Sequence, residues 1–110
     1  MNESEFNDVV DDFLIQVEDA IEDACDETGA NIDYETASGI LTLTFSNASQ
    51  IIINRQTPLK QIWVACKQGG FHFDFDDNAK QWLCNGTEIF AALSGYCSYQ
   101  AEQEITLEAA

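Results

Sequence analysis

Basic residues are scarce in this chain. Four Lys and Arg stand against 20 Asp and Glu in 110 residues, which gives a formal net charge of −16. Proteins bind DNA, RNA and anionic lipid headgroups through Lys and Arg, so this balance argues against all of them as direct partners. We therefore expect no nucleic-acid partner and no membrane partner. Cations and basic protein surfaces remain as candidate partners.

Leader and membrane-spanning patterns are also absent. The chain opens with Glu3, Glu5 and Asp8 and no basic residue, whereas secretory and mitochondrial leaders begin with positive charge. No apolar run approaches the roughly 18 residues that cross a bilayer. These features predict a cytoplasmic protein.

The residues of metal and thiol chemistry are few and dispersed. No C-x-x-C pair occurs, which argues against a zinc site or a redox dithiol. We expect free, buried thiols in a reducing compartment. The single histidine, His72, has no cysteine placed to pair with it, so we expect no enzyme. The four cysteines are Cys25, Cys66, Cys84 and Cys97.

A long amphipathic helix is the strongest pattern present. Apolar residues recur at three- and four-residue steps, which predicts a helix that begins at Asn2 or Ser4 and closes at Gly29. The members of this stripe are Phe6, Val9, Val10, Phe13, Leu14, Val17, Ala20, Ile21 and Ala24.

After Gly29 the apolar period changes to two, which is typical of strands. Thr87 is a candidate cap for a second helix, with Ile89, Phe90 and Leu93 on its buried side. This order predicts an α+β fold in one domain over residues 1–110. Two helices would pack on one face of an antiparallel sheet of about six strands, as a two-layer α-β sandwich. The expected strands cover 32–36, 40–45, 50–55, 60–67, 71–75 and 80–84.

Alternation along these strands assigns one sheet face to the core and the other to solvent. The core row is Leu41, Leu43, Phe45, Ile51, Ile53, Ile62, Val64, Cys66, Phe71, Phe73 and Phe75. The solvent row is Thr42, Thr44, Ile52, Asn54, Gln61, Trp63, Lys67, His72 and Asp74.

Acidic residues gather on the helix face opposite the apolar stripe. Glu18/Glu22 and Asp19/Asp23 are like-charge pairs four residues apart, each of which costs about 0.2–0.5 kcal/mol. No basic residue precedes Arg55, so we expect these acids to lack an ionic partner within the protein. A face kept only for solubility normally mixes both signs. The pattern favours a cation or a basic partner over the simpler alternative of a solvated face.

Asp26, Glu27, Asp33 and Glu35 extend this cluster past the helix end. Carboxylates are hard oxygen ligands that suit Mg²⁺, Ca²⁺, Mn²⁺ and iron. Because a helix face splays them toward water, the site should bind weakly, accept several divalent cations and lose affinity as salt rises.

Trp63 is the second feature with chemical meaning. It falls in the solvent row near Gln61 and Asn54. A large aromatic ring among hydrogen-bonding side chains is typical of an interface anchor. The alternative is that Trp63 belongs to the core.

Both features lie within a resemblance to a known family. The run Asn54–Trp63, with Ala65 and Lys67–Gly70 after it, resembles the signature strand pair of the frataxin family, and especially of its bacterial branch. The similarity extends to about Tyr99 and also covers Met1–Phe6, the acidic helix end, Leu41–Phe45 and His72–Asp74.

The resemblance implies an α-β sandwich that binds iron, as Fe²⁺ or Fe³⁺. It implies modulation of iron–sulfur cluster assembly through contact with a cysteine desulfurase and its scaffold protein, as iron donor or iron-sensing regulator. A monomer is expected in the absence of metal. The family's acidic ridge corresponds to Glu18, Asp19, Glu22, Asp23, Asp26, Glu27 and Asp33. Its partner-binding sheet surface corresponds to Asn54, Gln56, Gln61 and Trp63.

A different class of function would use the same charge. An acidic decoy imitates nucleic acid and occupies a basic cleft of another protein, without any need for metal. Trp63 and Asn54 separate the two hypotheses, because a charge mimic has no use for an aromatic ring among amides on the far side of the sheet.

Overall fold

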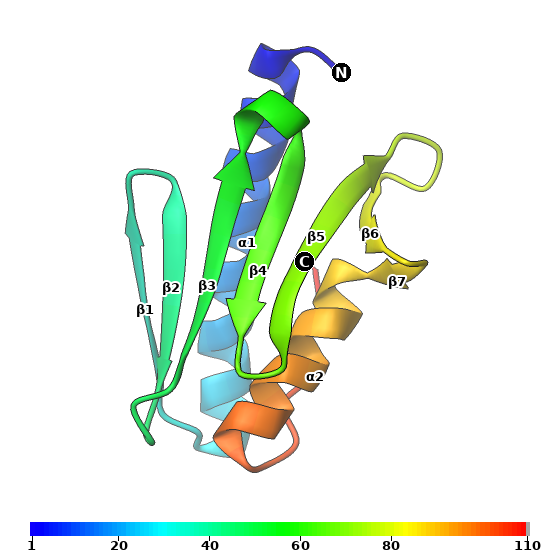
Figure 1. The fold of residues 1–110 in the computed structure, drawn as a ribbon. Coiled ribbons are helices and arrows are strands. Elements are labelled where there is room, and N and C mark those ends of the chain that lie inside the picture. Colours follow the sequence, from blue (N-terminus) through cyan, green and yellow to red (C-terminus); the bar gives the residue numbers. More distant parts are fainter. Residues whose placement is uncertain (110) are drawn as a thin grey trace.

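Two helices lie behind one antiparallel sheet, and the front of the sheet is open (Figure 1). The computed structural model describes residues 1–109. The first helix, α1 (Glu3–Thr28), follows the predicted apolar stripe, and α2 (Ile89–Ala101) lies beside it. The predicted two-layer α-β sandwich is confirmed.

The ends of α1 are fixed by local chemistry. Of the two predicted first caps, the structure uses Asn2, whose side chain accepts a 2.8 Å hydrogen bond from the Glu5 amide. The Glu5 carboxylate accepts one of 3.1 Å from the Asn2 amide, which completes a capping box. At the other end Gly29 is left-handed, with φ of 76°, and donates to the Cys25 carbonyl.

The sheet is a meander in which every strand pairs antiparallel with the next along the chain. It has seven strands, where the sequence predicts about six. The strands are β1 (Ile32–Ala37), β2 (Ile40–Phe45), β3 (Gln50–Gln56), β4 (Gln61–Cys66), β5 (Gly69–Asp76), β6 (Gln81–Cys84) and β7 (Thr87–Glu88). A 3₁₀ turn, η1 (Thr57–Leu59), joins β3 to β4.

The additional strand corrects the prediction for Thr87. Thr87 pairs with Cys84 as part of β7, and Glu88 caps α2 instead. The Glu88 carboxylate accepts from the Phe90 amide at 2.7 Å and from the Ala91 amide at 3.2 Å. A carboxylate at the start of a helix also faces the positive end of the helix dipole.

The core lies between the helices and the back of the sheet. Leu41, Leu43, Ile51, Ile53 and Phe73 of the predicted core row are fully buried. Cys66, Phe71 and Phe75 are only partly buried, although they face the same side. Phe71 stacks on Tyr96 of α2 with ring centroids 4.9 Å apart, and Phe75 meets Trp82 edge-on.

The C-terminal segment, which the sequence leaves without a predicted structure, packs against α2. Ile105 and Leu107 are buried. The Ser98 hydroxyl accepts from the Ile105 amide, and the Ser94 hydroxyl accepts from the Leu107 amide. The segment therefore completes the core beside α2.

The cysteines are all free thiols, as predicted, but only Cys97 is fully buried. Burial raises the pKa of the Cys97 thiol to about 12. No helix within residues 1–109 combines the length and the apolar character of a membrane span.

Candidate metal and partner surfaces

The predicted metal ligands of α1 lie along one side of the helix, away from its buried stripe. We call Glu18, Asp19, Glu22, Asp23, Asp26 and Glu27 the acidic ridge. Glu18 is half-buried and the other five are exposed. The buried residues of α1, from Phe6 to Ala24, hold the opposite side against the core. The fold thus brings these six carboxylates together on one helix surface.

Three acids of α1 lie nearest the sheet and form an inner row: Asp11, Glu18 and Glu22. Asp11 precedes Glu18 by about two helical turns, and Glu22 follows Glu18 by about one turn, so all three lie on one side of the helix. Each contacts a different residue of the first three strands. Thr36 of β1 donates a 2.5 Å hydrogen bond to Glu18 Oε2, and the Tyr34 hydroxyl donates to Glu22 Oε1. Glu18 and Glu22 of the inner row are therefore hydrogen-bonded to β1.

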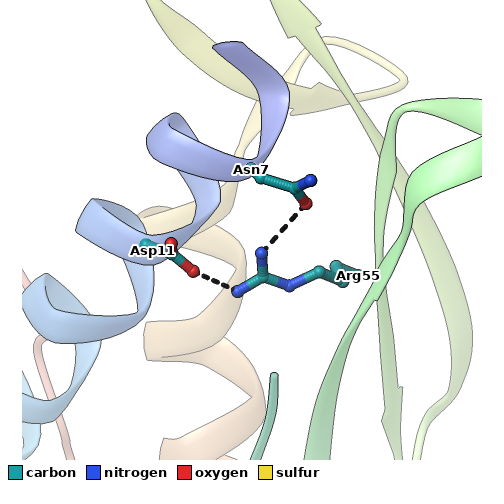
Figure 2. A network of polar contacts seen from close by, with 3 residues as sticks. All are labelled: Asn7, Asp11 and Arg55. Carbon is teal, nitrogen blue, oxygen red and sulfur yellow. Dashed lines mark hydrogen bonds and ion pairs between the residues drawn. The ribbon is translucent and has the colours of Figure 1, made fainter. Parts of the chain in front are cut away.

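Arg55 supplies the third contact, and it corrects the expectation that the helix acids lack an ionic partner. The Arg55 guanidinium reaches from β3 to α1, where it meets Asp11 at 2.5 Å and donates to Asn7 Oδ1 at 3.1 Å (Figure 2). This ion pair is the one salt bridge within residues 1–109. Arg55 Nε is buried without a hydrogen-bond partner in that range.

Gly39 makes room for this guanidinium. It sits in the β1–β2 turn with φ of 76°, and a Cβ at this position would lie 3.0 Å from Arg55 Nε. Both the backbone conformation and the close approach favour glycine here.

The contact with Glu22 changes the acidity of the phenol. The hydrogen bond to Glu22, with smaller effects from partial burial and from the charges of Glu22, Glu18 and Asp19, raises the pKa of Tyr34 to about 12. Tyr34 therefore keeps its proton to a higher pH than an unperturbed tyrosine does, and its hydroxyl acts as a donor toward the ridge.

The remaining ridge acids form an outer row, Asp19, Asp23, Asp26 and Glu27, and all four are exposed. Neither a hydrogen bond nor an ion pair joins their side chains to the rest of the described chain. In residues 1–109 no group of three or more potential ligands is close enough to form a ready metal cage. The donor set is entirely carboxylate, which suits a hydrated hard cation held at a surface.

Asp33 is not brought to the ridge. It pairs with Thr44 in β2, whereas its neighbours Ile32 and Tyr34 turn toward α1. Because successive strand residues point to opposite faces, Asp33 belongs to the open side of the sheet. It lines a shallow depression there with Ile40 and Ile52.

The four predicted partner residues form one block on the open face. Asn54 lies opposite Trp63, and Gln56 lies opposite Gln61, in the β3–β4 pairing. Trp63 is half-buried and is not part of the core. The predicted alternation is therefore right, and the alternative that places Trp63 in the core is wrong.

Two residues that the candidate partner set leaves out complete this block. The ring of His72 on β5 stacks on Trp63, with centroids 4.2 Å apart and planes 9° apart. Trp63 Nε1 donates to Gln61 Oε1 at 2.9 Å, and Gln61 Nε2 donates to Asp74 Oδ1 at 3.0 Å. Their place in the solvent row opposite Trp63 and Gln61 is the signal that could have identified them.

The family model for the frataxin-like domain matches residues 1–103 of this chain. This chain belongs to the frataxin family. Two curated relatives from this family are named iron-sulfur cluster assembly protein CyaY. The one from Vibrio cholerae is 46% identical over 107 residues, which cover 96% of this chain and 97% of the relative. The one from Polaromonas is 46% identical over 111 residues, which cover 99% and 94%.

Solved structures of the frataxin family share the fold. The frataxin from Psychromonas ingrahamii has a TM-score of 0.80 and 34% identity, over 96% of this chain and 97% of that chain. A trimeric yeast frataxin complexed with ferrous iron has a TM-score of 0.71 and 27% identity, over 86% and 87%.

Proposed function

We propose that this chain binds iron on the acidic ridge and takes part in iron–sulfur cluster assembly in the cytoplasm, as a binding protein and not as a catalyst. Membership of the frataxin family, combined with a ridge whose outer row has no partner in the described chain, carries the proposal. The names of the relatives from Vibrio and Polaromonas support the assembly role.

In the metal-binding step of this proposal, the negative charge of the acidic ridge attracts the iron ion. The outer row offers carboxylates that no Lys or Arg within residues 1–109 neutralises, so a cation there relieves repulsion between Asp19 and Asp23. A surface site of this kind leaves most metal-bound water in place, so we expect weak binding of Fe²⁺ or Fe³⁺ and tolerance of other divalent cations. The yeast frataxin complexed with ferrous iron supports the choice of metal.

The docking step uses the opposite layer. The open face presents Asn54 and Gln56 beside the stacked pair of Trp63 and His72, with no helix covering them (Figure 1). Such a half-buried ring among amides suits a flat protein surface. We propose that a cysteine desulfurase and its scaffold protein dock here.

One titration tests both steps. We expect sub-stoichiometric Fe²⁺, added without oxygen, to broaden the amide NMR signals of residues 18–27 and to leave those of residues 42–63 sharp. Addition of the desulfurase should then shift signals around Trp63 and Asn54. Uniform broadening, or none, would contradict the metal step, and signals on the open face that ignore the desulfurase would contradict the docking step.

The acidic decoy is separated by the same experiment. A decoy would bind its partner through the ridge alone, so partner binding would shift residues 18–27 and spare Trp63. Its binding would also require no iron.

A further inference from the structure

The sheet ends in one long strand whose outer edge is unpaired. β1 is the first strand in the order of the sheet, and it pairs only with β2. Among residues 1–109, no helix or strand lies beyond it (Figure 1). The opposite end of the sheet differs, because β7 has only two residues. In the described chain, β1 is therefore the long free edge of the sheet.

The turn after β1 fixes which of its backbone groups face that edge. Ser38 and Gly39 have φ of 53° and 76°, and they form a two-residue hairpin turn that the Ala37–Ile40 pair closes. The pair that closes such a hairpin is hydrogen-bonded. Hydrogen-bonded and non-hydrogen-bonded pairs then alternate along an antiparallel ladder.

This alternation leaves the backbone of Tyr34 and Thr36 pointing outward. Asp33 and Glu35 use their amides and carbonyls in the ladder with β2, whereas those of Tyr34 and Thr36 face the free edge. Within residues 1–109 no other residue forms a hydrogen bond with these outward groups. The edge therefore offers two amides and two carbonyls that a further strand can use.

The usual means of blocking an edge are absent from β1. Proteins protect edge strands with proline, with a bulge, with lysine or with a covering element. β1 contains neither proline nor lysine, and it pairs with β2 residue for residue without a bulge. Its residues 33–37 are all exposed. The edge is regular and accessible along most of its length.

Charge determines which kind of strand can pair with this edge. Asp33 and Glu35 stand on its open-face side. Glu18 and Glu22 of α1 stand on its other side, where each accepts a hydrogen bond from a β1 hydroxyl. A second copy of β1 would bring its own acids against these, and like charges on paired strands are destabilising. A basic segment would meet opposite charge on both sides.

The surface beside the edge suits a long basic side chain. Asp33 and Glu35 line the shallow depression of the open face together with Ile40 and Ile52, each of which is 37% exposed. Lys and Arg lay their methylene groups along apolar surface and keep the charged head group in a polar environment. Alternate side chains of an added strand would lie over this depression.

We propose that the free edge of β1 pairs with an extended segment of another protein that carries Lys or Arg at alternate positions. The backbone of the segment bonds the outward amides and carbonyls of Tyr34 and Thr36, and its basic side chains lie over the depression. In recognition of this kind, main-chain hydrogen bonds supply affinity and alternate side chains supply specificity. The inference does not rest on the proposed function, because it requires neither iron nor docking around Trp63.

The test uses a short capped peptide in which Lys and Val alternate, titrated into the iron-free wild-type chain and followed by amide NMR. We expect saturable shifts at residues 32–37 and slower hydrogen exchange at the amides of Tyr34 and Thr36. The amides of Asp33 and Glu35, which already bond β2, should gain little protection. The same peptide with N-methylated central amides keeps its charge but loses its donors, so it should bind about tenfold more weakly.

Tyr34→Pro tests the edge from the side of the protein, because proline removes an amide that the β1–β2 ladder does not use. Peptide affinity should fall about tenfold. Tyr34→Phe is the matched control, which loses only the hydroxyl and should bind the peptide within about twofold of the wild type. Thermal unfolding checks each variant, and if Tyr34→Pro does not fold, the N-methylated peptide decides.

A second pair of substitutions tests the charge. Asp33→Asn with Glu35→Gln should weaken peptide binding and reduce its salt dependence, because two of the acids at the edge are neutralised. A peptide in which Glu and Val alternate should not bind the wild-type chain. Binding of this acidic peptide at equal strength would contradict the choice of a basic partner.

Three further results would overturn the inference. The basic peptide could leave residues 32–37 unshifted. The N-methylated peptide could bind equally well, which would reduce the contact to charge alone. Shifts at residues 32–37 could also grow with protein concentration in the absence of peptide, which would make a second copy the partner. None of these results bears on iron binding at the ridge or on docking around Trp63.

Discussion

The acidic ridge and the open face of the sheet differ in how far the protein satisfies its own polar groups. On the open face, Trp63, Gln61, His72 and Asp74 contact one another, so that even the indole N–H of Trp63 has an internal acceptor. On the ridge, the outer row makes no such contact within residues 1–109, and only Arg55 brings a positive charge to α1. One surface is preassembled, and the other carries charge that is open to solvent.

The difference matches the kinds of ligand that each surface suits. A protein partner binds tightly when aromatic anchors are already ordered, because less side-chain freedom is lost on docking. A hydrated cation needs charge and access more than order, and it exchanges readily when no preformed cage holds it. The two surfaces also lie on different layers, so the proposed metal capture and the proposed docking are compatible on one molecule at the same time (Figure 1).

The largest expected effect comes from a substitution on the open face of the sheet. Trp63→Ala should weaken binding of the desulfurase about 30-fold or more, which corresponds to roughly 2 kcal/mol at an interface anchor. Its free energy of unfolding should fall by only about 1 kcal/mol, the value of the lost stacking on His72. Calorimetric binding and urea unfolding measure the two quantities.

Thr44→Ala is the matched control for Trp63→Ala. Thr44 lies on the same open face, two strands away on β2, and should leave desulfurase binding unchanged. A stability loss of several kcal/mol in Trp63→Ala would show that the ring supports the core. Unchanged desulfurase binding would favour the acidic decoy.

The next effect concerns the ridge. Asp19→Asn, Asp23→Asn and Asp26→Asn together should raise the free energy of unfolding by about 0.5–1 kcal/mol, because they remove repulsion between neighbouring acids and negative charge near the C-terminus of α1. Fe²⁺ affinity should fall about tenfold, as one or two weak ionic contacts are lost. The salt dependence of the melting temperature should shrink as well.

A charge-matched variant separates local repulsion from net charge. Glu102→Gln, Glu104→Gln and Glu108→Gln remove the same charge from exposed positions beyond α2. They should leave Fe²⁺ affinity intact. Equal stabilisation in both triple variants would mean that overall charge, and not the spacing on α1, sets the repulsion.

The elements that the sequence predicts are those with a long pattern. The apolar stripe and its two caps define α1 almost to the residue, and alternation assigns the sheet faces correctly. β7 has only two residues, too few to show a period, and Thr is a commoner helix cap than Glu, so the predicted cap at Thr87 is wrong. The apolar pair Ile105 and Leu107 alternates as well, over too short a run to indicate how the segment packs.

The surfaces could be predicted as sets of residues but not as networks. The sequence places Trp63 beside Asn54 and Gln61, because strand pairing follows from the short connection between β3 and β4. It does not indicate the contact between Arg55 and Asp11, which are 44 residues apart. Nor does it indicate the hydrogen bond from Thr36 to Glu18, which are 18 residues apart. Such pairs depend on how the helix layer sits over the sheet, which no local pattern encodes.

The smallest expected effect is a change in alkaline stability at the junction of α1 and β1. Tyrosine titrates near 10.0 in an unfolded chain, and the pKa of Tyr34 is raised to about 12 in the fold, first through its hydrogen bond to Glu22. Between these values the unfolded state has lost a proton that the folded state keeps. The stabilisation is therefore complete below pH 10 and is lost as the pH rises toward 12.

Without metal, both Tyr34→Phe and Glu22→Gln should lose stability less steeply with pH than the wild type over this range, as measured by urea unfolding. The buried thiol of Cys97, whose pKa is also raised, adds the same slope to every variant and cancels in the comparison. Asp12→Asn removes one exposed helix charge that does not contact Tyr34, and it should keep the wild-type slope. Asp12→Asn could instead flatten the pH dependence of the unfolding free energy as much as Glu22→Gln does. In that case the general negative charge of α1, and not the hydrogen bond from Tyr34 to Glu22, raises the pKa of Tyr34.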